Sequence, residues 1–192
     1  MLTNFDFIAD PTALDNSDVD GKLYVYGTNE GFDYADGKLA ANSYSNHSLS
    51  ILSTSDMVNW TDHGEILNSS QVPWGRPEGG FMWAPDCAYK NGTYYFYFPH
   101  PSGTDWNNTW KVGIATSKYP AKDFKVQGYI KGIDDACGMI DPCVFIDDDG
   151  QAYLYHGGCG RIIGAKMKDN MMELAEKPRS MERLKDFHEG AW

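Results

Sequence analysis

The sequence predicts an all-β fold of the β-propeller type, and three observations support this prediction. Short segments rich in aromatic and β-branched residues, each bounded by turn residues, follow one another along most of the chain, which is typical of strands. Asp-Gly and Asn-Gly pairs mark tight hairpin turns. One hairpin unit recurs three times, and four-stranded sheets that repeat at such an interval are the blades of a propeller.

The expected strands are short, and most of them pair with a neighbour through a tight turn. Aromatic and β-branched side chains favour extended backbone because they pack well on a pleated surface. The one helix-like stretch is 169–176, and it lacks a convincing apolar face. The clearest strand segments are 23–26, 49–52, 94–98, 112–115, 144–146 and 152–155, with hairpin turns at 20–21, 91–92 and 149–150.

An acid next to a proline opens each of the three repeated units, at Asp10, Asp86 and Asp141. A Gly- and Asn-rich insertion at 27–46 lengthens the first unit, and a fourth unit begins with Glu189. We therefore expect residues 1–192 to form a single, incomplete propeller domain with three blades and the first strand of a fourth. An open propeller edge exposes unpaired backbone, so a second chain or self-association is expected to complete the ring.

Charge and composition limit the classes of partner. The chain has a formal net charge of -11 and a pI near 4.7, which argues against nucleic acid and against an anionic membrane surface as partners. No apolar run approaches the roughly 20 residues that a membrane span needs. The first residues lack the features of a signal peptide, so we expect a cytoplasmic protein, or a secreted one if a leader has been trimmed.

The four cysteines are too few for a disulfide scaffold. Free, buried thiols are the expected state, and a bridge between Cys137 and Cys143 is the alternative.

The acids at the blade starts are the main candidate site. The innermost strand of each blade runs along the propeller axis, so residues just before these strands point into one funnel, namely Asp10, Asp86, Asp141 and Glu189. Carboxyl groups gathered at low dielectric repel one another, which raises the pKa of at least one of them. Hydrolysis by two carboxyl groups needs such a set, with one protonated acid and one carboxylate that activates water. The alternative is that these acids only form turns and cap strand starts.

The motifs around these acids resemble a known family. Segments 7–13, 82–86, 139–142 and 188–190 are similar, in order and spacing, to the motif series of glycoside hydrolase family 43. The resemblance implies a five-bladed propeller that hydrolyses arabinose- and xylose-containing plant polysaccharides with inversion. It also implies that Asp10 is the general base, that Glu189 is the general acid, and that Asp141 orients the general acid and keeps it protonated.

Aromatic residues before Asp86 are candidates for substrate binding, because sugar faces stack on aromatic rings. We predict that Trp83, Asp86, Phe81 and His100 bind substrate, with packing between blades as the alternative for Phe81 and a turn role for His100. The strand pattern places His100 at the rim opposite an acid start. Trp74, Trp106 and Trp110 are expected to pack between blades, with lining of a cleft as the alternative. Arg76 and Glu78 could reach a substrate hydroxyl or form a surface ion pair.

No metal loop is complete in the sequence. The segment that begins at Asn16 has Gly27 where a calcium loop needs a bidentate Glu, and His156 and Cys159 lack further ligands at zinc spacing. We therefore expect no required cofactor and no metal ligand in this chain. The family resemblance implies that a calcium ion can lie on the propeller axis, with its matching ligand beyond Trp192.

Together these observations predict an inverting glycoside hydrolase that releases arabinofuranosyl or xylosyl residues from hemicellulose oligosaccharides. The loop at 27–46 and the Trp-rich segment at 74–110 would close one end of the funnel, which favours exo action. An endo-acting arabinanase and a truncated propeller fragment that binds sugar without cleaving it are the two alternatives.

Overall fold

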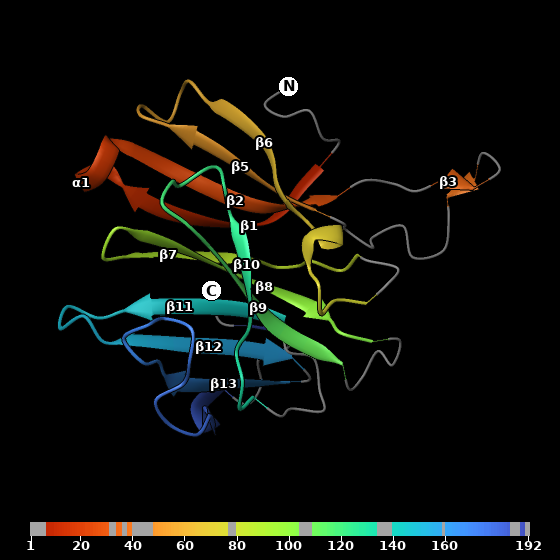
Figure 1. Cartoon of the computed structure of the whole chain (residues 1–192). Helices are drawn as coiled ribbons and strands as arrows, with labels where there is room; N and C mark the ends of the chain where they lie inside the picture. The colour runs from red at the N-terminus through yellow and green to blue at the C-terminus, as the bar shows by residue number, and fades with distance from the viewer. Residues whose placement is uncertain are drawn as a thin grey trace.

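In a computed structural model, the described residues form three four-stranded antiparallel sheets and one two-stranded ribbon (Figure 1). The sheets follow one another along the sequence and are arranged as consecutive propeller blades. This confirms the predicted all-β fold with three blades. The structure describes residues 7–30, 34–35, 38–39, 48–76, 80–103, 109–133, 140–158, 160–184 and 189–190.

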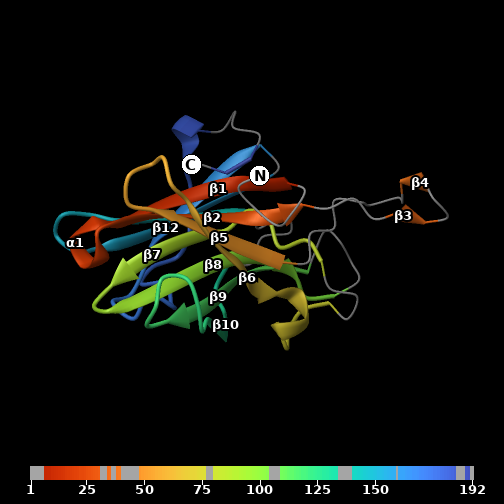
Figure 2. The same cartoon turned by 90° about the horizontal axis from the view of Figure 1, so that it is seen from above.

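Blade one has the strand order β1-β2-β5-β6. A one-turn helix, α1 (Ser17–Asp20), joins the first two strands where the sequence predicted a two-residue turn, and Gly21 closes it with a φ of 76°. The second strand extends to Glu30, so the first residues of the predicted insertion belong to the blade. A small ribbon of β3 (Tyr34–Ala35) and β4 (Lys38–Leu39) lies apart from the blades (Figure 2). The blade strands are β1 (Phe7–Asn16), β2 (Lys22–Glu30), β5 (Ser48–Thr54) and β6 (Thr61–Asn68).

Blade two lies between the other two blades, and its strands reflect this position. A short 3-10 helix, η1 (Ser69–Gln71), follows blade one and precedes the segment that leads into this sheet. Side chains of β8 are buried in an unbroken run from Phe96 to Pro101, because both faces of the strand are covered. The sheet order is β10-β9-β8-β7, from β7 (Asp86–Lys90), β8 (Thr93–Pro101), β9 (Trp110–Ser117) and β10 (Lys125–Tyr129).

Blade three has the order β11-β12-β13-β14 and ends in a very short outer strand. The helix-like stretch at 169–176 is not helical: it forms turns closed by a bridge between Met167 and Leu174. Its lack of an apolar face explains why packing does not stabilise a helix there. The strands are β11 (Ile140–Ile146), β12 (Ala152–Gly158), β13 (Arg161–Lys166) and β14 (Arg179–Ser180), followed by the 3-10 helix η2 (Glu182–Leu184).

Two hydrophobic cores fill the two spaces between consecutive blades. The first joins blades one and two around Tyr26 and Phe96, and the second joins blades two and three around Tyr97 and Leu154. The other face of blade three carries Phe145, which is 53% exposed. The expectation that a second chain covers such a face stays a prediction. Cys87 and Cys143 are free thiols, whereas Cys137 and Cys159 lie outside the described residues.

The inner strands gather on one side of the molecule. Strand β7 contacts both β1 and β11. Seen from above, the outer strands β6 and β10 lie on the side opposite β1 (Figure 2). The residues that begin the inner strands are therefore neighbours in space although they are far apart in the sequence.

A buried carboxylate joins the three inner strands. Asp86, at the start of β7, accepts a hydrogen bond of 2.8 Å from the Thr12 hydroxyl of β1 and one of 2.6 Å from the Val144 N–H of β11. Both of its oxygens thus hold a neighbouring blade. Burial raises the pKa of this carboxyl, and the hydrogen bonds that it accepts partly offset that effect.

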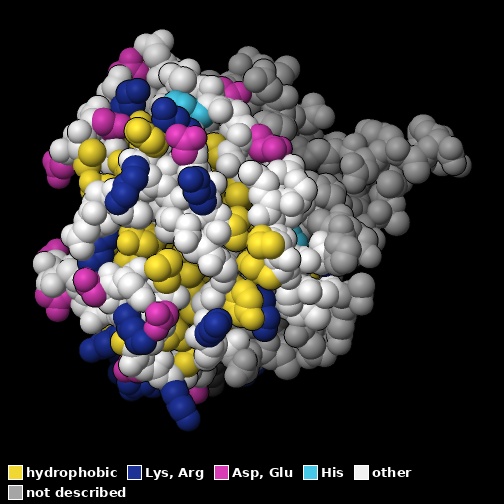
Figure 3. Space-filling view, viewed as in Figure 1, with side chains coloured by type: hydrophobic (Ala, Val, Ile, Leu, Met, Phe, Trp, Pro, Cys, Tyr) yellow, Lys and Arg dark blue, Asp and Glu magenta, His cyan; other side chains and the backbone are white. Residues whose placement is uncertain are grey.

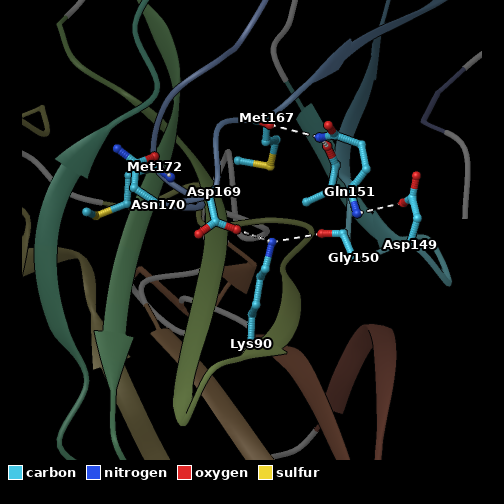
Figure 4. Close-up of polar contacts among 9 residues, drawn as sticks. Lys90, Asp149, Gly150, Gln151, Met167, Asp169, Asn170 and Met172 are labelled. Atoms are coloured by element: carbon cyan, nitrogen blue, oxygen red, sulfur yellow. Dashed lines mark hydrogen bonds and ion pairs between the residues drawn. The ribbon is translucent and has the colours of Figure 1, made fainter.

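A second clamp joins blades two and three at their hairpin turns (Figure 4). The Lys90 ammonium donates to the carbonyl oxygen of Gly150 over 2.8 Å and pairs with Asp169 over 2.7 Å. Gln151 donates to the carbonyl oxygen of Met167 over 2.9 Å and thereby fixes the turn that carries Asp169. Blade two therefore holds blade three from both ends of β7, through Asp86 at the start of that strand and Lys90 at its end.

No helix among the described residues has the length and apolar character that crossing a membrane would require.

Replacing Asp86 by Ala should lower the free energy of unfolding by about 1–3 kcal/mol, because the partly buried Val144 N–H loses its acceptor. Asp86→Asn is the matched control, since its carbonyl oxygen can accept from Val144 while its amide donates to the Thr12 hydroxyl. We expect this variant to lose less than Asp86→Ala when both are unfolded in urea. Equal losses would show that the polar brace contributes nothing.

Candidate active site

Two of the predicted acids lie at equivalent backbone irregularities in different blades. In blade one, Ala9 pairs with Thr28 and Thr12 pairs with Tyr26, so Asp10 and Pro11 together oppose a single residue. In blade three the same shift leaves Asp141 and Pro142 opposite a single residue between the pairs made by Ile140 and Cys143. Each is a β-bulge, which re-aims a side chain relative to the regular sheet. Proline is tolerated there because it has no N–H to donate to the ladder.

Both bulges place the acid in the left-handed region, with a φ of 50° at Asp10 and 52° at Asp141. Asp is among the few non-glycine residues that adopt this conformation readily. The residue opposite the first bulge is Gly27, where an added Cβ would collide with Ile8 and lie 3.0 Å from the carbonyl oxygen of Ala9. The Asp-Pro pairs and Gly27 thus set the local geometry that turns these carboxyl groups out of the regular pattern.

Asp141 is the hub of the site. Its side chain is buried, and its Oδ2 accepts a hydrogen bond of 2.9 Å from the backbone N–H of Gly190. The backbone N–H of Ala84 also donates to this carboxyl. One carboxyl group therefore ties the segment that enters blade two to the segment that begins at Glu189.

Asp141 lies within electrostatic range of both Glu189 and Asp10. Burial is the largest cause that raises the pKa of Asp141, and the negative charges of Glu189 and Asp10 raise it further. The N–H donors of Gly190 and Ala84 oppose this shift, which nevertheless remains upward. The side chains of Asp10 and Glu189 are exposed, so the mouth of the site is open to solvent.

Glycines let the Glu189 segment pass close to blade three. An added Cβ at Gly157 would lie 2.5 Å from both the carbonyl oxygen of Glu189 and the Cα of Gly190. An added Cβ at Gly190 would collide with the side chain of Asp141. Neither glycine has a positive φ, so the constraint at both positions is space.

An aromatic group lies beside these acids. Trp83 precedes Ala84, which donates to Asp141, and the peptide bond between Trp83 and Ala84 is cis. The Trp83 ring stacks on Trp110, with 5.1 Å between ring centroids, and meets Phe81 edge to face at 5.9 Å. Arg76 lies over Phe81 at 5.2 Å from the ring centroid. Trp83 and Phe81 are half-buried and can offer aromatic surface, whereas Trp110 is buried and supports them.

Two other predicted binding residues lie in unexpected surroundings. The Asp86 carboxylate holds β1 and β11, which favours a structural role over the predicted substrate contact. His100 lies near the end of β8, and β8 runs antiparallel to β7. It therefore lies at the same end as Asp86, and the predicted opposite rim is wrong. His100 is fully buried, with 2.6 Å between its Nδ1 and the carbonyl oxygen of Pro101 and its ring against Trp74.

The remaining candidates divide between packing and residues outside the described ranges. Trp74 stacks on Phe98 at 6.1 Å between ring centroids, which agrees with the expected inter-blade packing. Glu78 and Trp106 lie outside the described residues. Sequence reasoning missed Gly157, Gly190 and Ala84, which position the acids through their backbone. The one signal in the sequence was that Gly190 directly follows the predicted acid Glu189.

No group of three or more His, Cys, Asp or Glu side chains within the described ranges could hold a metal ion.

Comparison with known proteins agrees with the geometry. The family model for glycosyl hydrolases family 43 matches residues 6–190. The chain belongs to this family. Among solved structures, RS223-Beta-xylosidase aligns with a TM-score of 0.75 and 27% identity, covering 95% of this chain and 63% of that one. The native Bacillus subtilis arabinanase Arb43A aligns with a TM-score of 0.66 and 25% identity over 92% of this chain and 57% of that one. These neighbours are five-bladed propeller enzymes, which confirms the predicted fold type.

Two curated relatives have names that combine a xylosidase and an arabinosidase activity. The "Xylosidase/arabinosidase 43A" of Humicola insolens is 35% identical over 162 residues, which cover 82% of this chain and 45% of that protein. The "Xylosidase/arabinosidase" of Bacteroides ovatus is 30% identical over 209 residues, covering 92% of this chain and 59% of that protein. The chain therefore spans about half the length of these relatives.

Replacing Gly157 by Ala should displace the Glu189–Gly190 segment, because the new methyl group has no room beside it. The expected result is loss of the hydrogen bond from Gly190 to Asp141, seen as amide exchange at Gly190 that is at least about tenfold faster. Gly103→Ala is the control, since the nearest atom there is a Thr109 methyl carbon at 3.1 Å on a side chain that can move. Unchanged exchange in Gly157→Ala would contradict the close packing described.

The raised pKa of Asp141 predicts a pH-dependent stability difference between the protein and its Asp141→Asn variant. A carboxyl with a raised folded-state pKa stabilises the fold fully below its unfolded pKa, and this contribution is lost as the pH rises through the folded pKa. The variant should therefore gain stability relative to the parent as the pH rises above the unfolded-state pKa of Asp, about 3.9. Urea unfolding at a series of pH values measures the difference in the free energy of unfolding. A difference that does not change with pH would show that ionisation of Asp141 does not destabilise the fold.

Proposed function

We propose that the protein is an inverting glycoside hydrolase that removes arabinofuranosyl or xylosyl residues from hemicellulose-derived oligosaccharides. The single observation that carries this proposal is the environment of the buried carboxyl of Asp141, which binds the N–H of Gly190, directly after Glu189, and is acted on by the charges of Glu189 and Asp10. Membership of the family and relatives named xylosidase/arabinosidase support the reaction class.

Each acid receives a role that agrees with its surroundings. Asp10 is exposed and acts as the general base: it takes a proton from a water molecule that attacks the anomeric carbon. Glu189 acts as the general acid and gives its proton to the glycosidic oxygen as the bond between that oxygen and the anomeric carbon breaks. The product sugar then has the opposite anomeric configuration, because water enters on the face opposite the leaving group. Such a pair should be about 6.5–9.5 Å apart.

Asp141 acts as a positioning residue through the backbone. Its carboxyl fixes Gly190, the residue directly after the proposed general acid, and thereby fixes where Glu189 begins. The carboxyl also fixes Ala84, directly after Trp83, so the acid and the aromatic surface share one anchor. Holding reacting groups in place in this way contributes to rate because small displacements of a catalytic group are costly.

The aromatic group beside the acids supports a pentose substrate. Trp83 and Phe81 offer apolar ring surface on which the C–H groups of a sugar can pack, with Arg76 beside them as a hydrogen-bond donor. CoXyl43, described as a β-xylosidase/α-arabinofuranosidase and solved with xylotriose, is 30% identical over 91% of this chain and has a TM-score of 0.74. We assign exo action to this chain from the expected closure of one end of the funnel.

An endo-acting arabinanase is the second candidate. A "Probable arabinan endo-1,5-alpha-L-arabinosidase B" from Aspergillus fumigatus is 36% identical over 111 residues, which cover 51% of this chain and 28% of that protein. Product length separates the two candidates: exo action releases single pentoses from the first minutes, whereas endo action on linear arabinan releases a ladder of oligosaccharides.

The two catalytic roles predict that the loss of hydrolysis rate depends on the leaving group in one variant and not in the other. Glu189→Gln should slow hydrolysis of xylobiose or arabinobiose by about 10²–10⁴-fold, because the leaving oxygen goes unprotonated. Its effect on 2,4-dinitrophenyl glycosides should be much smaller, since that leaving group needs no proton. Asp10→Asn should slow both substrates alike, because the attacking water loses its base.

Initial rates with both substrates and the anomer of the first product by NMR test these roles. The Gly103→Ala variant serves as a control for changes remote from the acids. Retention of configuration, or a Glu189→Gln loss that is equal for both leaving groups, would overturn the assignment. Binding of xylotriose without any hydrolysis would favour the sugar-binding fragment instead.

A further inference from the structure

One surface of this acidic protein is basic. Between residues 111 and 131 the sequence contains five lysines and a single acid, Asp123, for a formal charge of +4, whereas the whole chain has a charge of -11. These residues form β9, β10 and the turn between them, on the periphery of blade two and away from the acids of the inner strands. We call this surface the β9–β10 face; its lysines are Lys111, Lys118, Lys122, Lys125 and Lys131.

Tyrosines on the β9–β10 face lie against its lysines. The ring of Tyr119, which is 50% exposed, has the Lys122 ammonium 4.3 Å from its centroid, and the ring of Tyr129 has the Lys111 ammonium at 5.6 Å. An exposed aromatic ring offers a stacking surface, and a neighbouring ammonium offers a partner for an anion. Figure 3 shows hydrophobic side chains gathered at the middle of this side of the molecule with Lys and Arg side chains around them.

The β9–β10 face is also hollowed. A cleft of about 500 Å³ lies at the beginning of β10. Its lining consists of two lysines, one acid, two aromatic residues and three hydroxyl-bearing residues: Lys118, Lys125, Asp123, Tyr119, Phe124, Thr93, Thr116 and Ser117. A second cleft, of about 630 Å³, lies at the end of the strand, lined by Gln127, Tyr129, Lys131 and Glu173 among others. Clefts of this size on both ends of one strand suit an extended chain of small polar units.

The turn that carries Tyr119 is held rigidly. The Ser117 hydroxyl donates to the carbonyl oxygen of Lys122 over 2.6 Å and accepts from the Tyr119 N–H over 3.0 Å. The Lys118 ammonium donates to the Thr93 hydroxyl over 2.6 Å and so lies along one side of the first cleft. Binding a ligand there would cost little ordering of the backbone.

From these observations we propose that the β9–β10 face binds a plant polysaccharide that carries uronic acid groups, at a site separate from the acids of the inner strands. Tyr119 stacks on a neutral sugar ring of the polymer, and Lys122 and Lys125 pair with its carboxylates. A polysaccharide with scattered carboxylates suits a basic face on an acidic protein, whereas nucleic acid, with about one charge per 1.7 Å, would also meet the repelling remainder of the surface. The choice of a plant polymer rests on the proposed function.

Affinity electrophoresis through gels that contain glucuronoxylan tests this proposal, with the same polymer after chemical reduction of its carboxyl groups as the matched ligand. Glucuronoxylan should retard the protein more strongly than the reduced polymer does. The double variant Lys122→Gln/Lys125→Gln should bind glucuronoxylan about fivefold more weakly than the parent, as expected for the loss of two exposed ion pairs. The difference should shrink between about 20 mM and about 300 mM NaCl. Tyr119→Ala should weaken binding to both polymers.

The control is Lys166→Gln/Lys177→Gln, which removes two exposed lysines from blade three and the segment after it and should change nothing. All three variants should hydrolyse small chromogenic glycosides at the parent rate, so failure of this binding site is distinguishable from failure of the proposed activity. Equal retardation by the two polymers would overturn the proposal, as would tighter binding to double-stranded DNA than to glucuronoxylan. Self-association of Lys122→Gln/Lys125→Gln with unchanged polymer binding would also overturn it, because the lysines would then only protect the edge strand β10.

Discussion

The carboxyl of Asp141 accepts hydrogen bonds from two backbone segments that are far apart in the sequence, and the arrangement of the site depends on these bonds. One donor follows Trp83 and the other follows Glu189. The carboxyl is buried and near two other negative charges, so it is held at a cost in electrostatic energy. Functional sites commonly keep such unfavourable groups where the surrounding fold is strong enough to support them.

That support comes from the packing of blade two. Its two faces are covered by the two cores, and its side chains Asp86 and Lys90 reach the neighbouring blades at opposite ends of β7. The inner strands are therefore held in register with one another, and the bulges at Asp10 and Asp141 occur on a rigid base. Asp10 lies in blade one, Asp141 lies in blade three and Glu189 follows blade three, so inter-blade packing sets the position of Asp10 relative to the other two.

Much of the fold could be predicted from sequence because hairpin signals are local. Asp-Gly and Asn-Gly turns with aromatic strands on both sides identified the blades, and three sheets are present as expected. The prediction that the acids at the blade starts occupy equivalent positions was less accurate. Asp10 and Asp141 precede a proline and lie in bulges, whereas Asp86 follows a proline and continues a regular ladder, which turns its carboxylate toward other blades. The order of the acid and the proline in each pair therefore distinguishes the two bulged acids from Asp86. The roles of Gly157 and Gly190 depend on contacts between blades, which no local pattern reports.

The continuous burial of β8 has a consequence for the chain before it folds. A segment of alternating polar and apolar residues hides only one face, but 94–98 is a run of five aromatic residues that needs cover on both sides. During synthesis such a run is prone to cross-β aggregation until blades one and three have formed. Lys90 before the run, and Pro99 and Pro101 after it, act as gatekeepers that limit how far an intermolecular ladder could extend. We therefore expect these three residues to limit aggregation of the nascent chain, apart from any role in the folded protein.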